Sequence, residues 1–332
     1  MSAETETGKK PITLRWAVTH ALDEEMERDD SVFLIGEDIG ASGGTFGLTR
    51  GLFDKYGARR VRDAPISEEG LTDLAVGAAL NGARPVLEIM FSDFMAITMD
   101  AVANQAAKHR YLSGGQMSVP LVIRTLSGGG FRAGAHHSQS LEAWYTHIPG
   151  LKVAYPSTPA DMKGLLKAAI RDDDPVIMLE PKAMYGLKGQ IPDGDHIVPF
   201  GSAEVRRPGS DVTIVAWGRM APVALEAAEA AAKDGIEAEV IDPRSLLPLD
   251  EDTILDSVAK TGNVIIVHEA PVSGGFGAEI AARIAEKCLF HLDSPIRRIG
   301  GAFSPIPIGD SEDLLFPVAD DVSAAIKELV GE

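Results

Sequence analysis

Apolar residues along the first half of the chain follow two alternating spacings. Short apolar runs such as SVFLIG (31–36) and RPVLEIMF (84–91) are typical of strands buried on both faces, and EEGLTDLAVGAALNG (68–82) carries apolar residues at helical spacing. Buried strands that alternate with helices predict a parallel sheet with helices on both faces. Further helices are predicted at 13–29, 93–112 and 159–172, and further strands at 119–125, 151–156 and 175–180.

A second domain is predicted beyond the segment YGLKGQIPDGDHIVPFG (185–201), which has neither spacing and is rich in Gly, Pro and Asp. After this linker the alternation restarts, with strands predicted at 211–218, 237–242 and 263–270 and helices at 222–235 and 250–262. The sequence therefore predicts two doubly wound, mostly parallel-sheet α/β domains, residues 13–184 and 202–332, after a disordered polar tail of residues 1–12.

Composition narrows the classes of function. The net charge of −18 argues against a nucleic-acid partner, because binding phosphates requires clustered Lys and Arg. No apolar run approaches the ~18 residues of a membrane span, and the polar start MSAETETGKK has no signal-peptide core. The single cysteine, Cys288, excludes an internal disulfide. We expect a cytoplasmic protein without a membrane partner.

The stretch SGGGFRAGAHHSQSLEAW (127–144) is compatible with a phosphate loop, a metal site, a nucleophile with its base, or part of a cofactor pocket. Its glycines fit neither GxxxxGK[ST] nor GxGxxG, which favours a flexible loop. His136 and His137 are adjacent, so in an extended segment their side chains point to opposite faces, which argues against a zinc site. Ser138 lies outside any GxSxG motif, which argues against a hydrolase. One histidine could still donate a proton, and the alternative is an ordinary loop histidine.

Two carboxylates begin the helix that follows RDAPIS. Ser67 is a predicted N-cap, and Glu68 and Glu69 fall in the first turn, where the helix dipole favours negative charge. That is a sufficient structural explanation. An equally good interpretation is that one carboxylate points into the crevice where α/β sheets bind ligands.

Longer blocks of the sequence, from about Thr13 to the C-terminus, match those of a known family in their extent and order. Among them are FLIGEDIG, DAPISEEG, AVGAALNGARPVLEIMFSDF, HHSQSLEAWYTHIPGLKVAYPSTPADMKGLLKAAIRDDDPVIMLEPK and EVIDPRSLLPLDEDTILDSVAKTG. Together they resemble the beta subunit of the thiamine-diphosphate-dependent 2-oxo acid dehydrogenases, whose members include pyruvate, branched-chain 2-oxo acid and acetoin enzymes. The resemblance implies a transketolase-like pyrimidine-binding domain followed by a transketolase C-terminal-like domain.

The resemblance also implies a site shared between chains. Thiamine enzymes hold magnesium and the diphosphate with a GDG…NN motif, which this sequence lacks; in the family a separate alpha subunit carries it. This chain would supply the aminopyrimidine half of the thiamine diphosphate site in a heterotetramer of two alpha and two beta chains. Its acidic C-terminal domain would dock on the acyltransferase core, through the subunit-binding domain of that core, and the lipoyl domain would visit the site.

Position by position, the resemblance gives Glu68 the hydrogen bond to the pyrimidine ring nitrogen, so that the cofactor can remove its own thiazolium proton. It makes His137 the active-site histidine, which donates a proton or hydrogen bond and assists acyl transfer to lipoyl. Met90 and Phe94 match positions that flank the pyrimidine, with core packing as the alternative. Relatives also bind a structural potassium ion, at positions that match Leu121, Val122, Ala169, Asp172 and Asp174.

The expected function is therefore that of a 2-oxo acid dehydrogenase beta subunit, which decarboxylates the 2-oxo acid and reductively acylates lipoyl. Pyruvate is the expected substrate, with acetoin or a branched-chain 2-oxo acid as the alternative. A rival of another class is a non-catalytic scaffold subunit. The intact blocks PISE (65–68) and HSQ (137–139) argue against it, because a scaffold does not require them.

Overall fold

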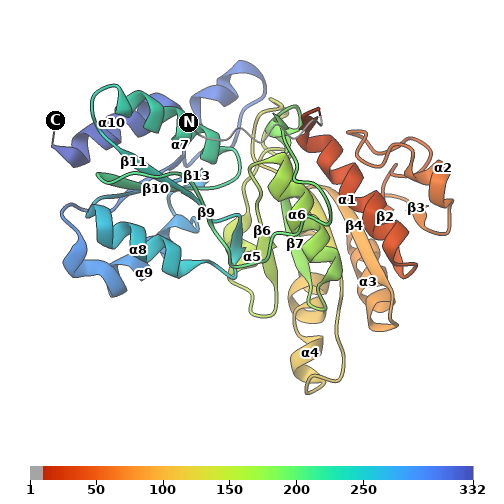
Figure 1. The fold of residues 1–332 in the computed structure, drawn as a ribbon. Coiled ribbons are helices and arrows are strands. Elements are labelled where there is room, and N and C mark those ends of the chain that lie inside the picture. Colours follow the sequence, from red (N-terminus) through yellow and green to blue (C-terminus); the bar gives the residue numbers. More distant parts are fainter. Residues whose placement is uncertain (1–9, 332) are drawn as a thin grey trace.

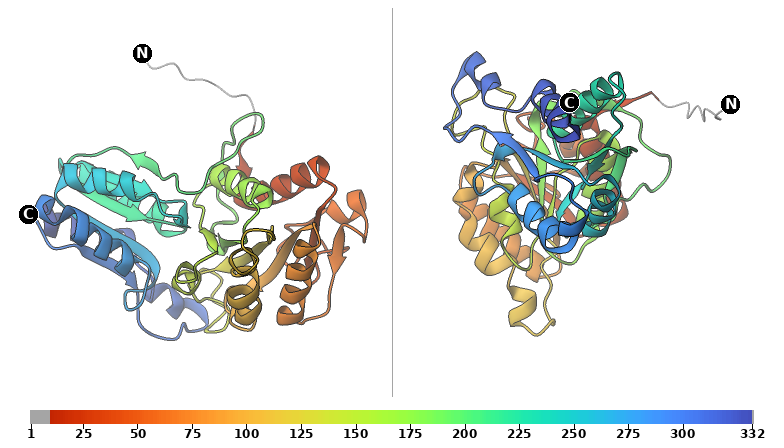
Figure 2. Two further views of the ribbon diagram at one scale, coloured as in Figure 1. Left: turned by 90° about the horizontal axis from the view of Figure 1, so that it is seen from below. Right: turned by 90° about the vertical axis from the view of Figure 1, so that its left-hand side faces the viewer.

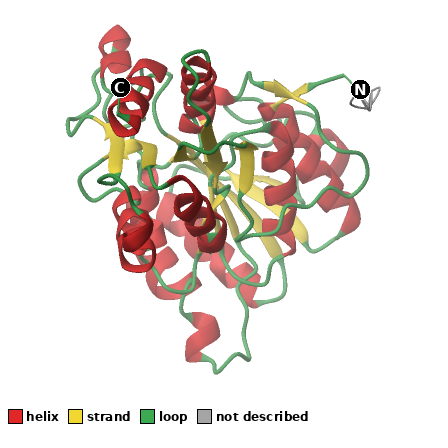
Figure 3. Ribbon diagram, turned by 60° about the vertical axis from the view of Figure 1, so that its left-hand side comes forward, coloured by secondary structure: helices red, strands yellow, loops and turns green. Residues whose placement is uncertain are grey.

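In the computed structural model, which describes residues 10–331, strands β2 to β7 of the first half and β12 of the second half form one seven-stranded sheet (Figures 1 and 3). The strand order is β12, β6, β7, β5, β4, β2, β3. The bounds are β2 (Val32–Gly36), β3 (Val61–Asp63), β4 (Arg84–Phe91), β5 (Val122–Ser127), β6 (Lys152–Ala154), β7 (Val176–Pro181) and β12 (Ser245–Leu247). All neighbouring strands are parallel except β12 and β6. The predicted parallel sheet is confirmed.

Helices cover both faces of this sheet, as Figure 2 shows. The α-helices of this half are α1 (Leu14–Arg28), α2 (Leu52–Tyr56), α3 (Glu68–Leu80), α4 (His109–Leu112), α5 (Glu142–Thr146) and α6 (Pro159–Arg171). Helices α1 and α6 pack together on one face, where Val18 and Leu166 are fully buried, and α3 packs on the other through Leu71 and Ala75. The apolar residues of these helices that face the sheet follow the helical spacing seen in the sequence.

The long helix predicted at 93–112 is wrong as a single element. The segment divides into a 3-10 turn η1 (Phe94–Ala96), a π-helix η2 (Ala101–Ala106) and the short α4. The amide of Ala107 bonds to the carbonyl of Val102, five residues back, which widens the helix by one residue. The Thr98 hydroxyl donates to the carbonyl of Met95 and so competes with backbone amides for that carbonyl, just before η2 begins.

The second half of the chain forms a five-stranded sheet in the order β14, β13, β10, β11, β9, in which only β9 is antiparallel to its neighbour. The strands are β9 (Glu204–Arg207), β10 (Val212–Ala216), β11 (Ala238–Asp242), β13 (Val264–Pro271) and β14 (Arg297–Gly301). The helices are α7 (Met220–Ala232), α8 (Glu251–Thr261), α9 (Gly277–Cys288) and α10 (Ala319–Val330). This sheet confirms the second doubly wound domain.

The two halves share strands and core. Strand β12 comes from the second half of the sequence but extends the first sheet beside β6. Ile123, Tyr155, Trp217 and Ile280 belong to one buried apolar cluster that runs through both sheets. The halves are therefore packed as one body.

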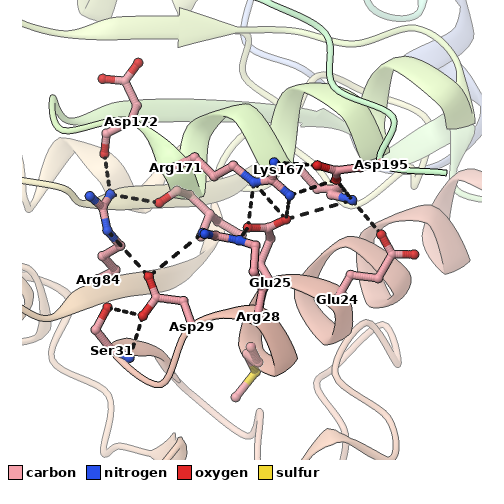
Figure 4. A network of polar contacts seen from close by, with 12 residues as sticks. Glu24, Glu25, Arg28, Asp29, Ser31, Arg84, Lys167, Arg171, Asp172 and Asp195 are labelled. Carbon is pink, nitrogen blue, oxygen red and sulfur yellow. Dashed lines mark hydrogen bonds and ion pairs between the residues drawn. The ribbon is translucent and has the colours of Figure 1, made fainter.

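The predicted tail and linker are partly ordered against the first domain. Residues 1–9 of the predicted tail lie outside the described residues. Ile12 belongs to a short strand β1 (Ile12–Thr13), which pairs with β8 (Lys188–Gly189) of the predicted linker. Asp195 of the same linker accepts ion pairs of 2.6 and 2.7 Å from Lys167 and Arg171 of α6 (Figure 4). These contacts lower the pKa of Asp195.

A buried charge cluster joins three central strands of the first sheet. Arg124 of β5 donates to Glu88 of β4 at 2.9 Å and to Glu180 of β7 at 2.7 and 3.1 Å, and all three side chains are at most 4% exposed. Burial raises the pKa of Glu88, although the Arg124 charge opposes this. Two buried carboxyl groups thus depend on one guanidinium.

We expect Arg124→Met to destabilise the fold by about 3–5 kcal/mol, because it leaves two buried carboxyl groups without their shared cation. The midpoint of chemical denaturation measures this loss, and adding Glu88→Gln to the same chain should recover part of it. Arg283→Met is the control, because Arg283 and Glu279 form an exposed pair on α9 that contributes roughly 0–1 kcal/mol. An Arg124→Met chain with an unchanged midpoint would contradict this interpretation.

Candidate active site

Chemically active side chains gather at the carboxyl edge of the first sheet. Glu37 follows β2, Glu68 begins the helix after β3, Met90 lies near the end of β4, His137 lies on the loop after β5, and Lys182 follows β7. Because these strands are parallel neighbours, their carboxyl ends meet on one side of the sheet. The strand order therefore brings together residues that are far apart in the sequence.

Glu68 lies half-buried beside a second carboxylate. Its neighbour is Glu37, whose pKa is raised by burial and further by the charge of Glu68. One carboxyl oxygen of Glu37 is buried without a hydrogen-bond partner among the described residues. The Glu37 carboxyl group therefore takes up a proton more readily than an ordinary carboxyl group does.

Glu69, the other carboxylate in the first turn of α3, has different surroundings. Burial raises its pKa, and the charges of Asp73 and Asp100 raise it further. Ser67 is the N-cap residue of α3 as predicted, but its side chain makes no capping hydrogen bond. The start of α3 thus leaves Glu68, and not Glu69, beside Glu37.

His137 is held between aromatic rings. Its imidazole lies edge-on to Phe91, with ring centroids 4.8 Å apart, and to Phe94 at 5.5 Å. The two predicted residues His137 and Phe94 are therefore in contact. Met90, the other residue predicted to flank a pyrimidine, is half-buried and accepts a 3.5 Å hydrogen bond from Thr45.

The loop that carries His137 is packed tightly, although its glycines led us to expect a mobile loop. A side chain at Gly128 would overlap Glu269, and one at Gly129 would overlap the ring of Phe316. The amide of Gly129 donates to Glu269 at 3.1 Å. These glycines therefore allow close approach of the second domain to the loop.

His136 lies apart from His137. It is exposed and lines a cavity of about 590 Å³ between the two domains, together with Trp144, Phe303 and Pro305. Neither Glu68 nor His137 lines that cavity.

The predicted potassium positions meet at the end of α6 and the start of β5. Lys152 donates to the Asp172 carboxylate at 2.5 Å. Arg84 donates to the Asp172 carbonyl at 2.9 Å (Figure 4). The carbonyls of Leu121 and Ala169 accept amide bonds within the fold. The remaining two predicted positions are Val122, which begins β5, and Asp174, which pairs with Arg110 at 2.5 Å. Protein cations thus already neutralise the carboxylates here, and potassium stays a prediction.

Two further features of the described part, residues 10–331, bear on the site. No group of three or more His, Cys, Asp or Glu side chains is placed to hold a metal ion there. None of its helices combines the length and apolar character that a membrane crossing requires.

Sequence reasoning missed Glu37 and Lys182. Both directly follow apolar strand runs, VFLIG and VIMLEP, so strand-end position was the signal that could have found them. Lys182 is 1% exposed, and burial lowers its pKa to about 8.

Comparisons with known proteins agree with the fold. The family model of the transketolase pyrimidine-binding domain matches residues 10–188, and that of the transketolase C-terminal domain matches residues 201–322. A solved structure of a split gene transketolase, an inactive beta4 tetramer, superposes with a TM-score of 0.79 at 26% identity. That match covers 97% of this chain and 99% of the other.

Full-length relatives are more similar in sequence. The chain is 46% identical to the beta subunit of acetoin:2,6-dichlorophenolindophenol oxidoreductase of Cupriavidus necator, over 96% of this chain and 97% of that protein. It is 45% identical to the 2-oxoisovalerate dehydrogenase beta subunit of Bacillus subtilis, over 94% and 97%. It is 46% identical to the mitochondrial pyruvate dehydrogenase E1 component subunit beta-2 of Oryza sativa subsp. japonica, over 96% and 86%. The chain belongs to the family of beta subunits of the thiamine-diphosphate-dependent 2-oxo acid and acetoin dehydrogenases.

Proposed function

We propose that this chain forms the aminopyrimidine half of a thiamine diphosphate site. The observation that carries the proposal is the arrangement of Glu68 beside Glu37, with Phe94 in contact with His137 along the same sheet edge. A carboxylate at the start of α3 and a half-buried aromatic ring suit a flat heterocycle with a basic ring nitrogen. The side chains present therefore fit the pyrimidine.

A separate alpha subunit would hold the diphosphate and magnesium. The donor set of this chain does not fit them, because the described residues gather no metal-binding cluster and the sequence lacks the GDG…NN motif. We therefore assign these ligands to the alpha chain, in an assembly of two alpha and two beta subunits.

The reaction we propose is decarboxylation of a 2-oxo acid followed by acylation of lipoyl. Bound thiamine diphosphate supplies the carbanion chemistry that this reaction requires. Glu68 holds and returns the proton of the pyrimidine ring nitrogen, and the neighbouring Glu37 favours proton sharing at that corner. His137, fixed by two aromatic rings, donates a proton or hydrogen bond to the substrate side.

Pyruvate is the acyl donor we propose, with acetoin or a branched-chain 2-oxo acid as the alternative. The relatives that act on these three kinds of substrate are 45–46% identical to this chain. The alpha chain would complete the substrate pocket. A cytoplasmic location also stays a prediction.

Two surfaces suit protein partners. Large apolar side chains are exposed just before α3, on α3 and in the segment that follows β4, namely Ile66, Leu74, Ile97, Tyr111, Leu112 and Met117. Such a surface suits the alpha chain or a second beta chain. We propose that the exposed carboxylates at the start of α10, Asp320 and Asp321, meet the basic subunit-binding domain of an acyltransferase core, whose lipoyl domain then visits the site.

The roles of Glu68 and His137 can be separated experimentally. In the complex reconstituted with alpha subunit, cofactor and magnesium, Glu68→Gln should slow exchange of the thiazolium proton by ~10²–10⁴-fold. His137→Ala should leave that exchange nearly normal and reduce single-turnover acylation of a lipoyl domain from pyruvate. NMR follows the exchange.

His136→Ala is the matched control, because this neighbouring histidine lines the cavity between the domains; both readouts should stay near those of the unaltered chain. If His137→Ala blocks proton exchange as strongly as Glu68→Gln, the division of roles is wrong. If the lipoyl domain is acylated faster from acetoin or from 2-oxoisovalerate than from pyruvate in the same assay, the faster donor replaces pyruvate as the assigned substrate.

Asp320→Lys should weaken binding of the subunit-binding domain by roughly threefold or more at low ionic strength, and salt should reduce the difference. Asp320 is exposed, whereas Asp321 caps α10 by accepting from the Val318 amide at 3.0 Å and should be left intact. Surface plasmon resonance at two salt concentrations measures the effect. The control is Asp256→Lys on α8, and equal affinities for the two variants would oppose docking at α10.

A further inference from the structure

Lys182 is attached to both ends of the loop that carries His137. It is the first residue after β7, and its ammonium group donates to the carbonyl of Gly128, where the loop leaves β5. The same group donates at 2.7 Å to the carbonyl of His137 itself. One side chain therefore joins the beginning and the functional end of the loop.

The surroundings of Lys182 are aromatic and enclosed. Its ammonium group lies 5.8 Å from the ring centroid of Phe91 and 5.9 Å from that of Phe131. Phe91 is also the ring that packs edge-on against His137. The charged groups that act on Lys182 are Glu269, Asp93, Glu312 and Arg219.

A buried carboxylate from the second domain holds the same loop from the other side. Glu312 lies on η5 (Gly309–Leu314) and is fully buried. One of its oxygens accepts from the amide of Gly130, and the other lies 3.5 Å from the Ser138 hydroxyl, which donates to it. Two carbonyls of the loop thus accept hydrogen bonds from the Lys182 ammonium group, and an amide and a hydroxyl of the loop donate to the Glu312 carboxylate.

We propose that Lys182 and Glu312 are positioning residues that fix the imidazole of His137 for acyl transfer. This inference rests on the proposed function of His137. The ammonium of Lys182 is turned toward backbone carbonyls, so its effect reaches the reaction through the loop. Charge-assisted bonds inside a low-dielectric site are stronger than neutral ones, and they hold the loop against its glycine-rich flexibility. Glu312 makes this position depend on the second domain.

The loop can be observed without cofactor or alpha subunit. In the isolated chain, Lys182→Met should increase amide hydrogen exchange within residues 129–138 by ~10-fold or more, because two charge-assisted bonds are lost. Glu312→Gln should increase exchange in the same segment and also serves if Lys182→Met does not fold. Lys167→Met is the control, because Lys167 is equally buried on α6 but pairs with Glu24 and Asp195. Its loop exchange should match that of the unaltered chain.

In the reconstituted complex, Lys182→Met should lower acylation of the lipoyl domain by roughly 10-fold or more while thiazolium proton exchange, which depends on Glu68, stays nearly normal. Unchanged exchange of residues 129–138 in both Lys182→Met and Glu312→Gln would overturn the positioning role, whatever the complex does. If the unaltered complex shows no thiazolium proton exchange, the proposed function fails, and the loop measurement still decides whether Lys182 and Glu312 hold the loop.

Discussion

Strands β2, β5 and β7 are buried along their whole length, so a polar side chain on them reaches a ligand only where the strand ends. Parallel pairing then brings these ends to one edge, because each strand leaves the sheet on the same side. Glu37, His137 and Lys182 lie at the same edge of the sheet because of this constraint. Glu68 lies at that edge too, because it follows the neighbouring strand β3. Arg124, a buried cation well inside the sheet, is paired with carboxylates from both neighbouring strands.

The second domain contributes more to the site than its separate sheet suggests. Glu269 and Glu312 reach across to amides of the glycine loop, and the glycines are small enough to let them approach. The same domain returns β12 to the first sheet and shares its apolar core. The position of His137 therefore results from both domains, and the cavity between them is lined by His136 and not by His137.

Most of the fold could be predicted because the spacing of apolar residues indicates which side of a helix or strand is buried. The strands at 84–91 and 212–216 and the helices α3 and α6 lie where their patterns placed them. Strand β12 could not be predicted, since its three residues pair with a strand almost a hundred residues earlier. The break at η2 depends on backbone hydrogen bonds that are shifted by one residue, and no apolar period records such a shift.

The residues of the candidate site also divide into those that the sequence could predict and those that it could not. The short motifs around Glu68 and His137 are local in sequence, so the family resemblance pointed to both. Lys182 donates to backbone carbonyls of a loop that is distant in the sequence, and Glu37 is linked to the site through the effect of the Glu68 charge on its pKa. Neither residue therefore has a local sequence signature.

The central claim is that this chain forms half of a cofactor site. Calorimetric titration of the isolated chain with thiamine diphosphate and magnesium tests it most directly, with the same titration repeated in the presence of the alpha subunit. We predict no tight binding by the isolated chain and one tight site per alpha–beta pair. One tight site per isolated chain would contradict the claim.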